Sequence, residues 1–423
     1  MLTTSEVFST RVNAVCDGWN PPATAPAGVR RAQKAGFSTR FKGRLHRRIE
    51  DAAAVWTRLQ SDGHATAYQR LDWVTSIATH LAGPSARQLL FVEIVDRCRD
   101  ETILLLPFAL KLRFGVRIIG WVDCGVCDYA APLVGRGVDL SAGEAAEVWT
   151  LALSLLPAVD LVDIRQVPAE VGGVPNPLTL LPQCRETTLE AFGVALEGDP
   201  QTQIRRLMGS KGYRHVNRQL VKLSERGTVR LIEPTSASEV EALFSTMVEQ
   251  RRQRFRDIGR FDILNTPAVE AFYLDMALRS LRDDGPAKLF GMAVGDEIVA
   301  TTYMLVHGGS MHGIILSIGS AEWSGSSPGF VIAVKMIEWA AARRLSYFDM
   351  TVGSLPYKSR LGGKARALYR LLEPRSPVGR LAASAMLVSA QTAAWLQDHP
   401  RLYQSLRAAR QTIRRLSTLR PER

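Results

Sequence analysis

Residues 323–335, WSGSSPGFVIAVK, join a polar loop to an apolar segment, and their types suit the binding of an anion. Ser327 is a common helix cap and Pro328 a common first helical residue, so we expect a helix from Pro328. A glycine in its first turn costs about 1 kcal/mol relative to alanine. Close approach of a phosphate would explain that glycine, because the N–H groups and dipole of a helix start favour an anion. The residues that would bind this phosphate are Gly325, Ser326, Ser327, Gly329 and Phe330.

A purely structural explanation of this loop is a tight turn whose glycines fit the packing. The stretch lacks the GxxxxGK[ST] pattern, so it is not a Walker-type phosphate loop. The sequence leaves phosphate binding and a packing turn both open.

Positive charge is concentrated in three stretches of the 423-residue chain, whose formal net charge is +12. Residues 1–50 carry nine basic and three acidic side chains, residues 356–423 carry fourteen and three, and residues 205–230 carry eight and one. Such clusters suit a phosphate-bearing ligand, nucleic acid or an anionic membrane surface. They are equally typical of solvated helix faces next to a disordered arm.

The five cysteines are scattered and odd in number, so they predict no disulfide framework. Cys124 and Cys127 form a single CxxC without the second pair that a zinc site needs, and we expect no metal. No signal peptide is visible, and the apolar stretch 381–397 is too short and too rich in small and polar residues to span a bilayer. These features predict a cytoplasmic protein.

Hydrophobic periodicity predicts an α/β (α+β) fold with two domains in tandem, each a mixed, mostly antiparallel sheet flanked by helices and separated by a cleft. In each half a run of antiparallel strands precedes a helix and a further strand, which suggests an architectural duplication. The turns at 295–296 and 308–309 predict a three-stranded meander, and Ser141 with Glu144 predicts a capping box. The expected division is a flexible basic arm at 1–45, domains at 46–204 and 205–375, and a basic helical tail at 376–423.

Several motifs resemble known acyltransferases. The order of meander, Gly-rich loop and helix resembles the GNAT acyltransferases, in which this helix start binds the pyrophosphate of acyl-CoA. Residues 347–363, YFDMTVGSLPYKSRLGG, resemble the CelD-type acyltransferases of cellulose and exopolysaccharide synthesis and the FemABX aminoacyltransferases, which are tandem GNAT proteins. Residues 65–74, 128–134 and 210–227 resemble further CelD-type signatures, and the resemblance covers about residues 50–370.

The resemblance implies N-acyl transfer from acyl-CoA to an amine or hydroxyl, and it suggests four catalytic side chains. Lys358 would stabilise an oxyanion or hold a phosphate, and Tyr357 would protonate the thiolate. Asp349 would accept hydrogen bonds from the acceptor amine, and His312 would be the general base. Each has a structural alternative, respectively a surface lysine, an aromatic anchor, a strand-end residue and a core histidine.

Three further residues are expected to bind substrate: Asp128, Tyr129 and Tyr303. Asp128 and Tyr129 would line the cleft between the domains, and Tyr303 would lie beside His312 on an adjacent strand. Period-two alternation along that strand would place His312, Ile314 and Leu316 on one face.

The donor and the partners are open at this level. Aminoacyl-tRNA as the donor in place of acyl-CoA, as in the FemABX proteins, would explain the basic stretches. A third hypothesis is that the protein is a non-catalytic scaffold of a polysaccharide assembly. The acceptor would be a small molecule or a lipid-linked saccharide. Residues 401–423 have a basic amphipathic pattern that predicts weak contact with the anionic inner membrane, although docking on the protein itself explains the same pattern.

Overall fold

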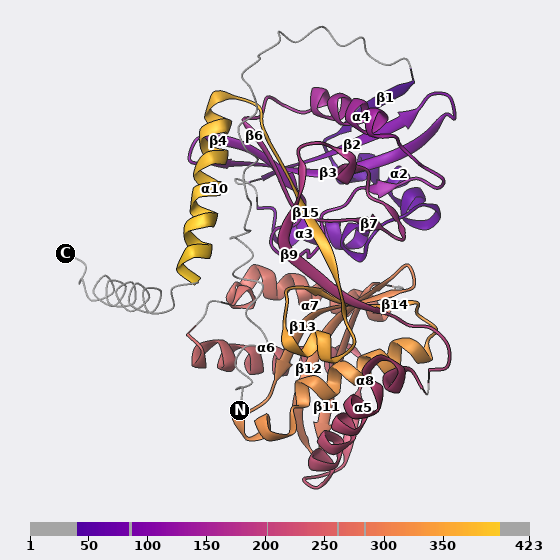
Figure 1. Cartoon of the computed structure of the whole chain (residues 1–423), viewed down its shortest axis with the longest axis vertical. Helices are drawn as coiled ribbons and strands as arrows, with labels where there is room; N and C mark the ends of the chain where they lie inside the picture. Colours follow the sequence, from indigo (N-terminus) through magenta and orange to yellow (C-terminus); the bar gives the residue numbers. More distant parts are fainter. Residues whose placement is uncertain (1–39, 84–86, 201, 260–261, 283–284, 398–423) are drawn as a thin grey trace, which may run out of the picture.

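The computed structural model describes residues 40–83, 87–200, 202–259, 262–282 and 285–397 and shows two similar α/β halves (Figure 1). The first half contains β1 (Phe41–His46), α2 (Ile49–Asp62), η2 (Ala67–Gln69), α3 (Leu71–His80), β2 (Arg87–Asp96), β3 (Glu101–Arg113), β4 (Val116–Trp121), β5 (Leu133–Val134), α4 (Ala142–Leu155), β6 (Leu161–Pro168), β7 (Glu170–Val171), β8 (Val174–Pro175), η3 (Pro177–Leu180) and β9 (Cys184–Ala195). The second half contains α5 (Gln203–Ser224), β10 (Val229–Ile232), α6 (Ala237–Asp257), η4 (Ile263–Asn265), α7 (Pro267–Arg282), β11 (Ala287–Val294), β12 (Glu297–His307), β13 (Ser310–Ile318), η5 (Ala321–Ser326), α8 (Pro328–Ala342), β14 (Tyr347–Val352), α9 (Pro356–Arg360) and β15 (Lys364–Pro374). The helix α10 (Pro377–Gln397) follows and packs on the first half.

The strand order of the sheet is nearly symmetric about its centre. It runs β1-β2-β3-β4-β6-β15-β9-β14-β13-β12-β11-β10, with β5 paired to β3 off this path. In each half four antiparallel strands lead to a parallel neighbour, β6 beside β4 and β14 beside β13. The sixth strand of each half comes from the other half, because β9 pairs with β14 and β15 pairs with β6. The expected duplication is therefore present, together with an exchange of strands.

The expectation of two separate sheets with a cleft between them needs correction. Among the described residues, β9 and β15 pair with each other and join the halves into one hydrogen-bonded sheet of 13 strands. Both strands run through the middle of the molecule in Figure 1. The fold class is confirmed as mixed α/β with a large, mostly antiparallel sheet flanked by helices.

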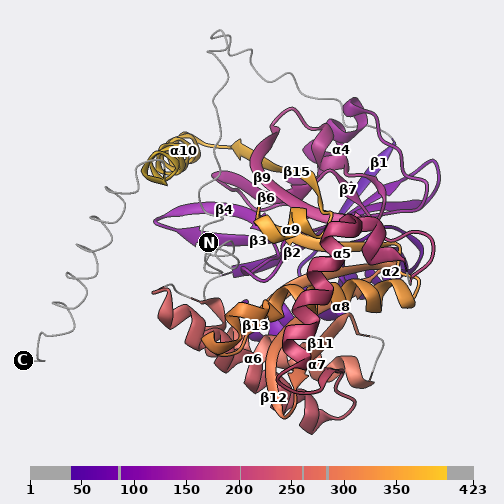
Figure 2. The ribbon, with the colours of Figure 1, turned by 60° about the horizontal axis from the view of Figure 1, so that its bottom comes forward.

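Helices cover both faces of the sheet. On one face α2 and α3 of the first half and α6 and α7 of the second half share a single hydrophobic core. Trp73 of α3 packs edge-on against Phe272 of α7, with ring centroids 4.7 Å apart. On the other face α4 covers the first half, while α5 and α8 cover the second and lie side by side (Figure 2). The continuous core fixes the position of one half against the other.

Local sequence signals explain most elements. Ser141 and Glu144 form the predicted capping box of α4, and α8 begins at Pro328 as expected. The meander β11-β12-β13 turns at 295–296 and 308–309, where the glycines have positive φ. Within α5, Gly209 at φ 65° separates two helical stretches, in agreement with an expected helical pair.

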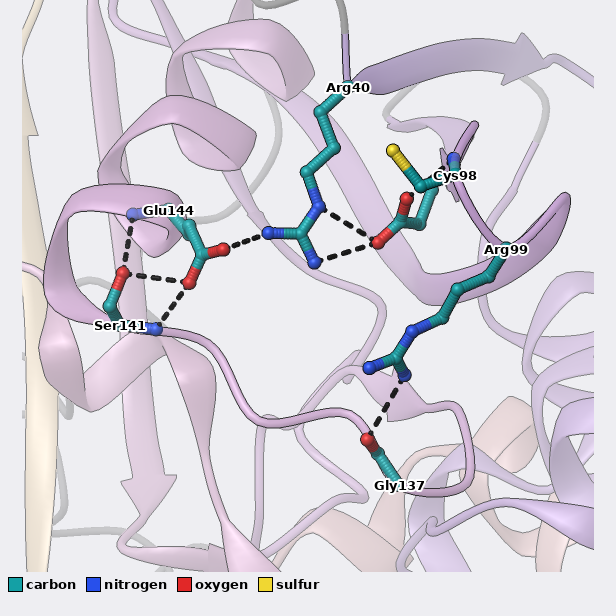
Figure 3. A network of polar contacts seen from close by, with 7 residues as sticks. Arg40, Cys98, Arg99, Gly137, Ser141 and Glu144 are labelled. Carbon is teal, nitrogen blue, oxygen red and sulfur yellow. Dashed lines mark hydrogen bonds and ion pairs between the residues drawn. The ribbon is translucent and has the colours of Figure 1, made fainter.

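The expected flexible arm at 1–45 is wrong for its last residues, because β1 pairs with β2 from Phe41 onward. Arg40 donates Nε and Nη2 to Asp96 at 2.9 and 2.8 Å and pairs with Glu144 of the α4 capping box (Figure 3). Arg99 donates to the carbonyl of Gly137 in the same region. These contacts attach the edge strand to both β2 and α4. Residues 1–39 lie outside the described residues.

The expected apolar helix over 381–397 is present as part of α10, and its side chain Ala383 is buried. The predicted amphipathic segment 401–423 lies outside the described residues. In the part of the chain that the structure describes, no helix combines the length and apolarity needed to cross a membrane.

Candidate active site

A gap in strand pairing creates the site. The parallel strands β13 and β14 pair only from Ser310 with Tyr347 to His312 with Asp349, although both strands continue beyond that point. A bulge lies in the same place, because Tyr303 pairs with Ile315 and Met304 pairs with Gly313. The unpaired parts of the two strands can therefore admit a ligand between them.

The bulge corrects the expected face of β13. Ile314 is the extra residue, so strict alternation ends there. Ile314 and Ile315 both belong to the core under α6 and α7, whereas Leu316 packs on the opposite side against Val331 of α8. His312, Ile314 and Leu316 do not share one face.

A central cavity of about 230 Å³ lies at this gap and is lined by both halves of the molecule. The first half contributes residues of the loop after β4 and the end of β6, and the second half contributes β12, β13, β14 and α9. Its polar lining includes Asp123, Asp128, Gln166, Thr302, Thr351 and Lys358.

A second cavity, of about 720 Å³, lies at the start of α8 and is called the α8 cavity here. Ser324, Ser327 and Phe330 line it from the loop side, while Arg254 of α6 and Arg360 of α9 contribute guanidinium groups. Tyr357 and Leu316 line both this cavity and the central cavity. The two cavities therefore meet at the end of β13.

The predicted anion site is only partly as expected. Ser327, Gly329 and Phe330 line the α8 cavity, but Gly325 and Ser326 are not among its lining residues in the described part of the chain. Ser326 is buried and donates its hydroxyl to the carbonyl of Trp323 at 3.0 Å. Gly325 is exposed, and its carbonyl accepts from Lys222 of α5 at 3.4 Å.

Two details of the helix start correct the sequence interpretation. Ser327 adopts a left-handed backbone at φ 49°, and its side chain does not cap the helix. The N–H of Phe330 donates to the carbonyl of Ser327 at 3.0 Å, so it is not a free donor. A Cβ at Gly329 would lie 2.8 Å from Cδ1 of Ile318, so packing against β13 accounts for that glycine.

Lys358 is buried rather than on the surface, with 2% of the residue exposed. Its Nζ donates to the carbonyls of Thr351 and Val352 at 2.9 and 2.8 Å. It also lies 5.8 Å from the ring centre of Phe192 on β9. Lys358 lines the central cavity and links the end of β14 to α9, the short helix that carries Tyr357.

Tyr357 is placed where a reacting group could reach it from either cavity. Burial raises the pKa of Tyr357 well above its ordinary value, so the phenol is neutral throughout the physiological range. A neutral phenol can donate a proton to a leaving group with a high proton affinity.

Asp349 and His312 lie together, but they face a different cavity. The third cavity, of about 420 Å³, is bordered by the β7–β8 hairpin and is called the hairpin cavity here. Nδ1 of His312 lies 3.4 Å from Oδ2 of Asp349, an ion-pair distance without hydrogen-bond alignment. Tyr129 of the first half donates to both Asp349 oxygens at 2.8 and 2.9 Å.

The environment of Asp349 favours a carboxylate. Burial alone would raise the pKa of Asp349, but His312, Tyr129 and the N–H of Thr351 outweigh burial and lower it. Burial, together with the charge of Asp349, raises the pKa of Tyr129 well above its ordinary value. Asp349, His312 and Tyr129 thus form a buried group that connects the two halves. This group borders the hairpin cavity, whereas Tyr357 and Lys358 line the central cavity.

The three expected substrate residues have three different positions. Asp128 lines the central cavity and accepts from Tyr68 at 2.9 Å, while Tyr129 borders the hairpin cavity. Tyr303 is fully buried, and its hydroxyl donates to the carbonyl of Tyr273 at 2.9 Å. Among the described residues Tyr303 lines none of these three cavities, and its full burial favours a structural role, so its substrate role stays a prediction.

Two strained residues at the central cavity were not foreseen. Thr351 at φ 57° and Gln166 at φ 56° both have left-handed backbones and line this cavity. Each lies in a bulge where two residues of β14 or β6 face one residue of the exchanged strand. A β-branched residue with positive φ is a genuine outlier, and such strain concentrates at functional sites. No sequence pattern marks either position, because both depend on pairing with the other half.

Most of the basic stretch 205–230 lies on α5, which packs beside α8 (Figure 2). Lys211, Arg214, Arg218 and Lys222 are exposed along it. Arg226 stacks over the ring of Trp323 in η5, with its Cζ 3.6 Å from the ring centre. A solvent-exposed row of positive charge therefore borders the predicted anion site.

Comparisons with known proteins show similarity at the level of one domain and of the fold. Residues 210–359 match the Acetyltransferase (GNAT) domain family. The crystal structure of FemX shares the fold at a TM-score of 0.54 and 9% identity, covering 80% of this chain and 99% of that chain. L-PGS from Bacillus licheniformis (TM-score 0.44, 11% identity, 80% and 95% covered) and a tandem GNAT protein from the clavulanic acid biosynthesis pathway (0.42, 12%, 80% and 99%) are also similar. Comparison of the sequence with curated proteins finds no match.

The match to the GNAT domain family lies beside these cavities and supports acyl transfer as the activity of the second half. The GNAT domain covers most of the second half, from α5 to α9. Among the described residues, no three His, Cys, Asp or Glu side chains are grouped to hold a metal ion.

Proposed function

We propose that the protein transfers an acyl group from acyl-CoA to an amine that binds in the central cavity between the two halves. The meeting of the central and α8 cavities at Tyr357 is the observation that carries this proposal. The α8 cavity offers a helix start, serine hydroxyls and two guanidinium groups, a combination that fits the phosphates of CoA.

The reaction follows from the residues at this meeting point. The acceptor nitrogen attacks the thioester carbonyl, a C–N bond forms and the C–S bond breaks. Tyr357 protonates the leaving sulfur, and the proton that the attacking nitrogen loses restores the Tyr357 hydroxyl. Asp128, on the first-half wall of the central cavity, accepts a hydrogen bond from the acceptor amine and orients it. Lys358 acts as a positioning residue, because its two bonds to β14 carbonyls hold Tyr357 in place.

Binding of CoA to purified protein, measured by calorimetry, tests the donor. Arg360→Glu reverses a charge at the α8 cavity, and we expect affinity to fall at least about tenfold. Arg282→Glu is the matched control, since Arg282 is exposed on α7 and is not a lining residue of the α8 cavity. Equal affinities for the two variants, or no binding by the unmodified chain, would reject the donor assignment.

Aminoacyl-tRNA is a second candidate donor, favoured by the exposed basic row on α5. A combined Arg214→Glu and Arg218→Glu variant should lose salt-sensitive tRNA binding if this reading is correct. The same variant should leave CoA binding nearly unchanged, since neither residue lines the α8 cavity.

The resemblance of residues 347–363 to CelD-type proteins supports a saccharide acceptor, small or lipid-linked, in exopolysaccharide or envelope synthesis. Mass spectrometry of ligands that copurify with the protein tests this assignment. A copurifying amine without any saccharide would contradict it.

A further inference from the structure

The β3–β4 hairpin and α10 carry an unusual share of the exposed apolar surface. Phe114, in the hairpin turn, is 93% exposed and Leu112 is 70% exposed. On α10, Val378, Leu381 and Val388 are 52%, 74% and 60% exposed. The described part of the chain exposes ten large apolar side chains, and these five belong to two neighbouring elements. Single exposed apolar side chains are ordinary, but a contiguous group marks an interaction surface.

A buried junction holds the two elements together. Asp160 accepts from the N–H of Arg117 at the base of the hairpin and from the hydroxyl of Ser376 before α10, at 3.0 and 2.8 Å. Gly379 allows the close approach, because a Cβ there would lie 1.6 Å from the carbonyl oxygen of Asp160. Figures 1 and 2 both show the hairpin and α10 on the same side of the molecule. We call these five apolar residues and their two elements the hairpin–α10 surface.

The turn of the β3–β4 hairpin has a strained backbone at Phe114, the most exposed of these residues. Phe114 and Gly115 have φ of 50° and 77°, the geometry of a tight turn that favours Asn-Gly or Gly-Gly. A positive φ is unfavourable for a bulky aromatic residue, and the ring of Phe114 is almost unburied, so burial does not offset this cost. Burial of this ring therefore contributes little to the stability of the fold.

Charge around the surface is mainly positive. Arg113 lies over the ring of Phe114, with its Cζ 5.5 Å from the ring centre, and Arg380 is exposed on α10. The acidic groups at the base are paired, Asp160 with Arg117 and Glu373 with Arg375.

We propose that the hairpin–α10 surface binds the surface of an anionic lipid bilayer. A protruding aromatic tip fits a deformable interface, whereas a protein partner would need a matching pocket for it. Val378, Leu381 and Val388 recur at helical spacing, so α10 can lie in the plane of the interface with flanking arginines at the headgroups. This inference is independent of the proposed acyl transfer.

Flotation with vesicles tests the surface. The full chain is mixed with vesicles of phosphatidylcholine alone or with about 30 mol % phosphatidylglycerol, at low and high salt. We expect binding only to the anionic vesicles and less of it at high salt. A Leu112→Ser, Phe114→Ser variant and a Leu381→Ser, Val388→Ser variant should each bind at least about tenfold more weakly.

The matched control is Val221→Ser, Leu231→Ser, which removes two exposed apolar side chains from the other half and should bind as the unmodified chain does. Equal flotation of all variants, or no binding to anionic vesicles, would overturn the proposal. Wild-type binding by both surface variants, with loss only on removal of residues 398–423, would assign the contact to the tail instead. A change from dimer to monomer in the hairpin variant by light scattering would make this a self-association surface and also overturn it.

Discussion

At the scale of single residues, the proposed reaction depends most on the Tyr357 hydroxyl. We expect Tyr357→Phe to lower kcat by about 10²–10⁴-fold with little change in KM, since only the proton donor is lost. Tyr213→Phe, on the exposed face of α5, is the control and should be fully active. Steady-state kinetics with a thiol-release assay gives both constants. Unchanged kcat in Tyr357→Phe would show that another group protonates the thiolate.

The packing of Gly329 predicts that a larger side chain lowers stability, whereas its sequence context predicts that it blocks phosphate binding. Gly329→Val should lower stability by about 1–3 kcal/mol, because its side chain would meet Ile318 rather than a ligand. Urea unfolding measures the loss, and adding Ile318→Ala should recover part of it by making room. A variant that unfolds like the wild type but binds CoA poorly would instead restore the phosphate explanation.

Asp349 predicts a dependence of stability on pH. Its folded pKa lies below the ordinary value of 3.8, so the carboxylate stabilises the fold fully above that pH and loses the contribution as pH falls through the folded value. Asp349→Asn should therefore be less stable than the wild type at neutral pH, with the difference shrinking below about pH 4. Thermal unfolding of both proteins across this range gives the comparison, and a constant difference would contradict it.

At the scale of elements, the bulge in β6 at Gln166 predicts that substitutions by glycine and by a β-branched residue change stability in different directions. Gln166→Gly should keep or raise stability because glycine accepts φ 56°, while Gln166→Val should lower it by about 1–2 kcal/mol. If Gln166 also shapes the acceptor site, the glycine variant will show a raised KM despite its stability. Equal stabilities of the two variants would mean that the backbone relaxes without strain.

Elements with local signals were predictable, and elements defined by distant partners were not. The meander, α4 and α8 follow from turn glycines, a capping box and Pro328, all within a few residues of each other. The strand β9 was missed because its sequence, CRETTLEAFGVA, alternates poorly and its partners β14 and β15 come more than 150 residues later. For the same reason Lys358 and Tyr357 could be nominated from a motif, but the burial of Lys358 against backbone carbonyls could not be foreseen.

At the scale of the whole molecule, a shared core and exchanged strands predict one cooperative unit. Tryptophan fluorescence reports on the tertiary packing of both halves, because Trp56, Trp73, Trp121 and Trp149 are buried in the first half and Trp323 and Trp339 in the second. Far-UV circular dichroism reports on the secondary structure of both halves. We expect the two signals to follow coincident urea transitions. Two separated transitions would show that each half is stable without the strand supplied by the other.

The exchange of β9 and β15 also has a consequence for synthesis on the ribosome. The first half receives its sixth strand from Lys364–Pro374, which emerges only when most of the chain has been made. Until then β6 has an unpaired edge, and β9 has no partner from the second half. Unpaired edges invite pairing with other chains, so the nascent first half is the stage most exposed to aggregation. Selection for rapid completion of the chain would act on the rate of translation. A chaperone that covers this edge would give the same protection, and neither change would alter the final fold.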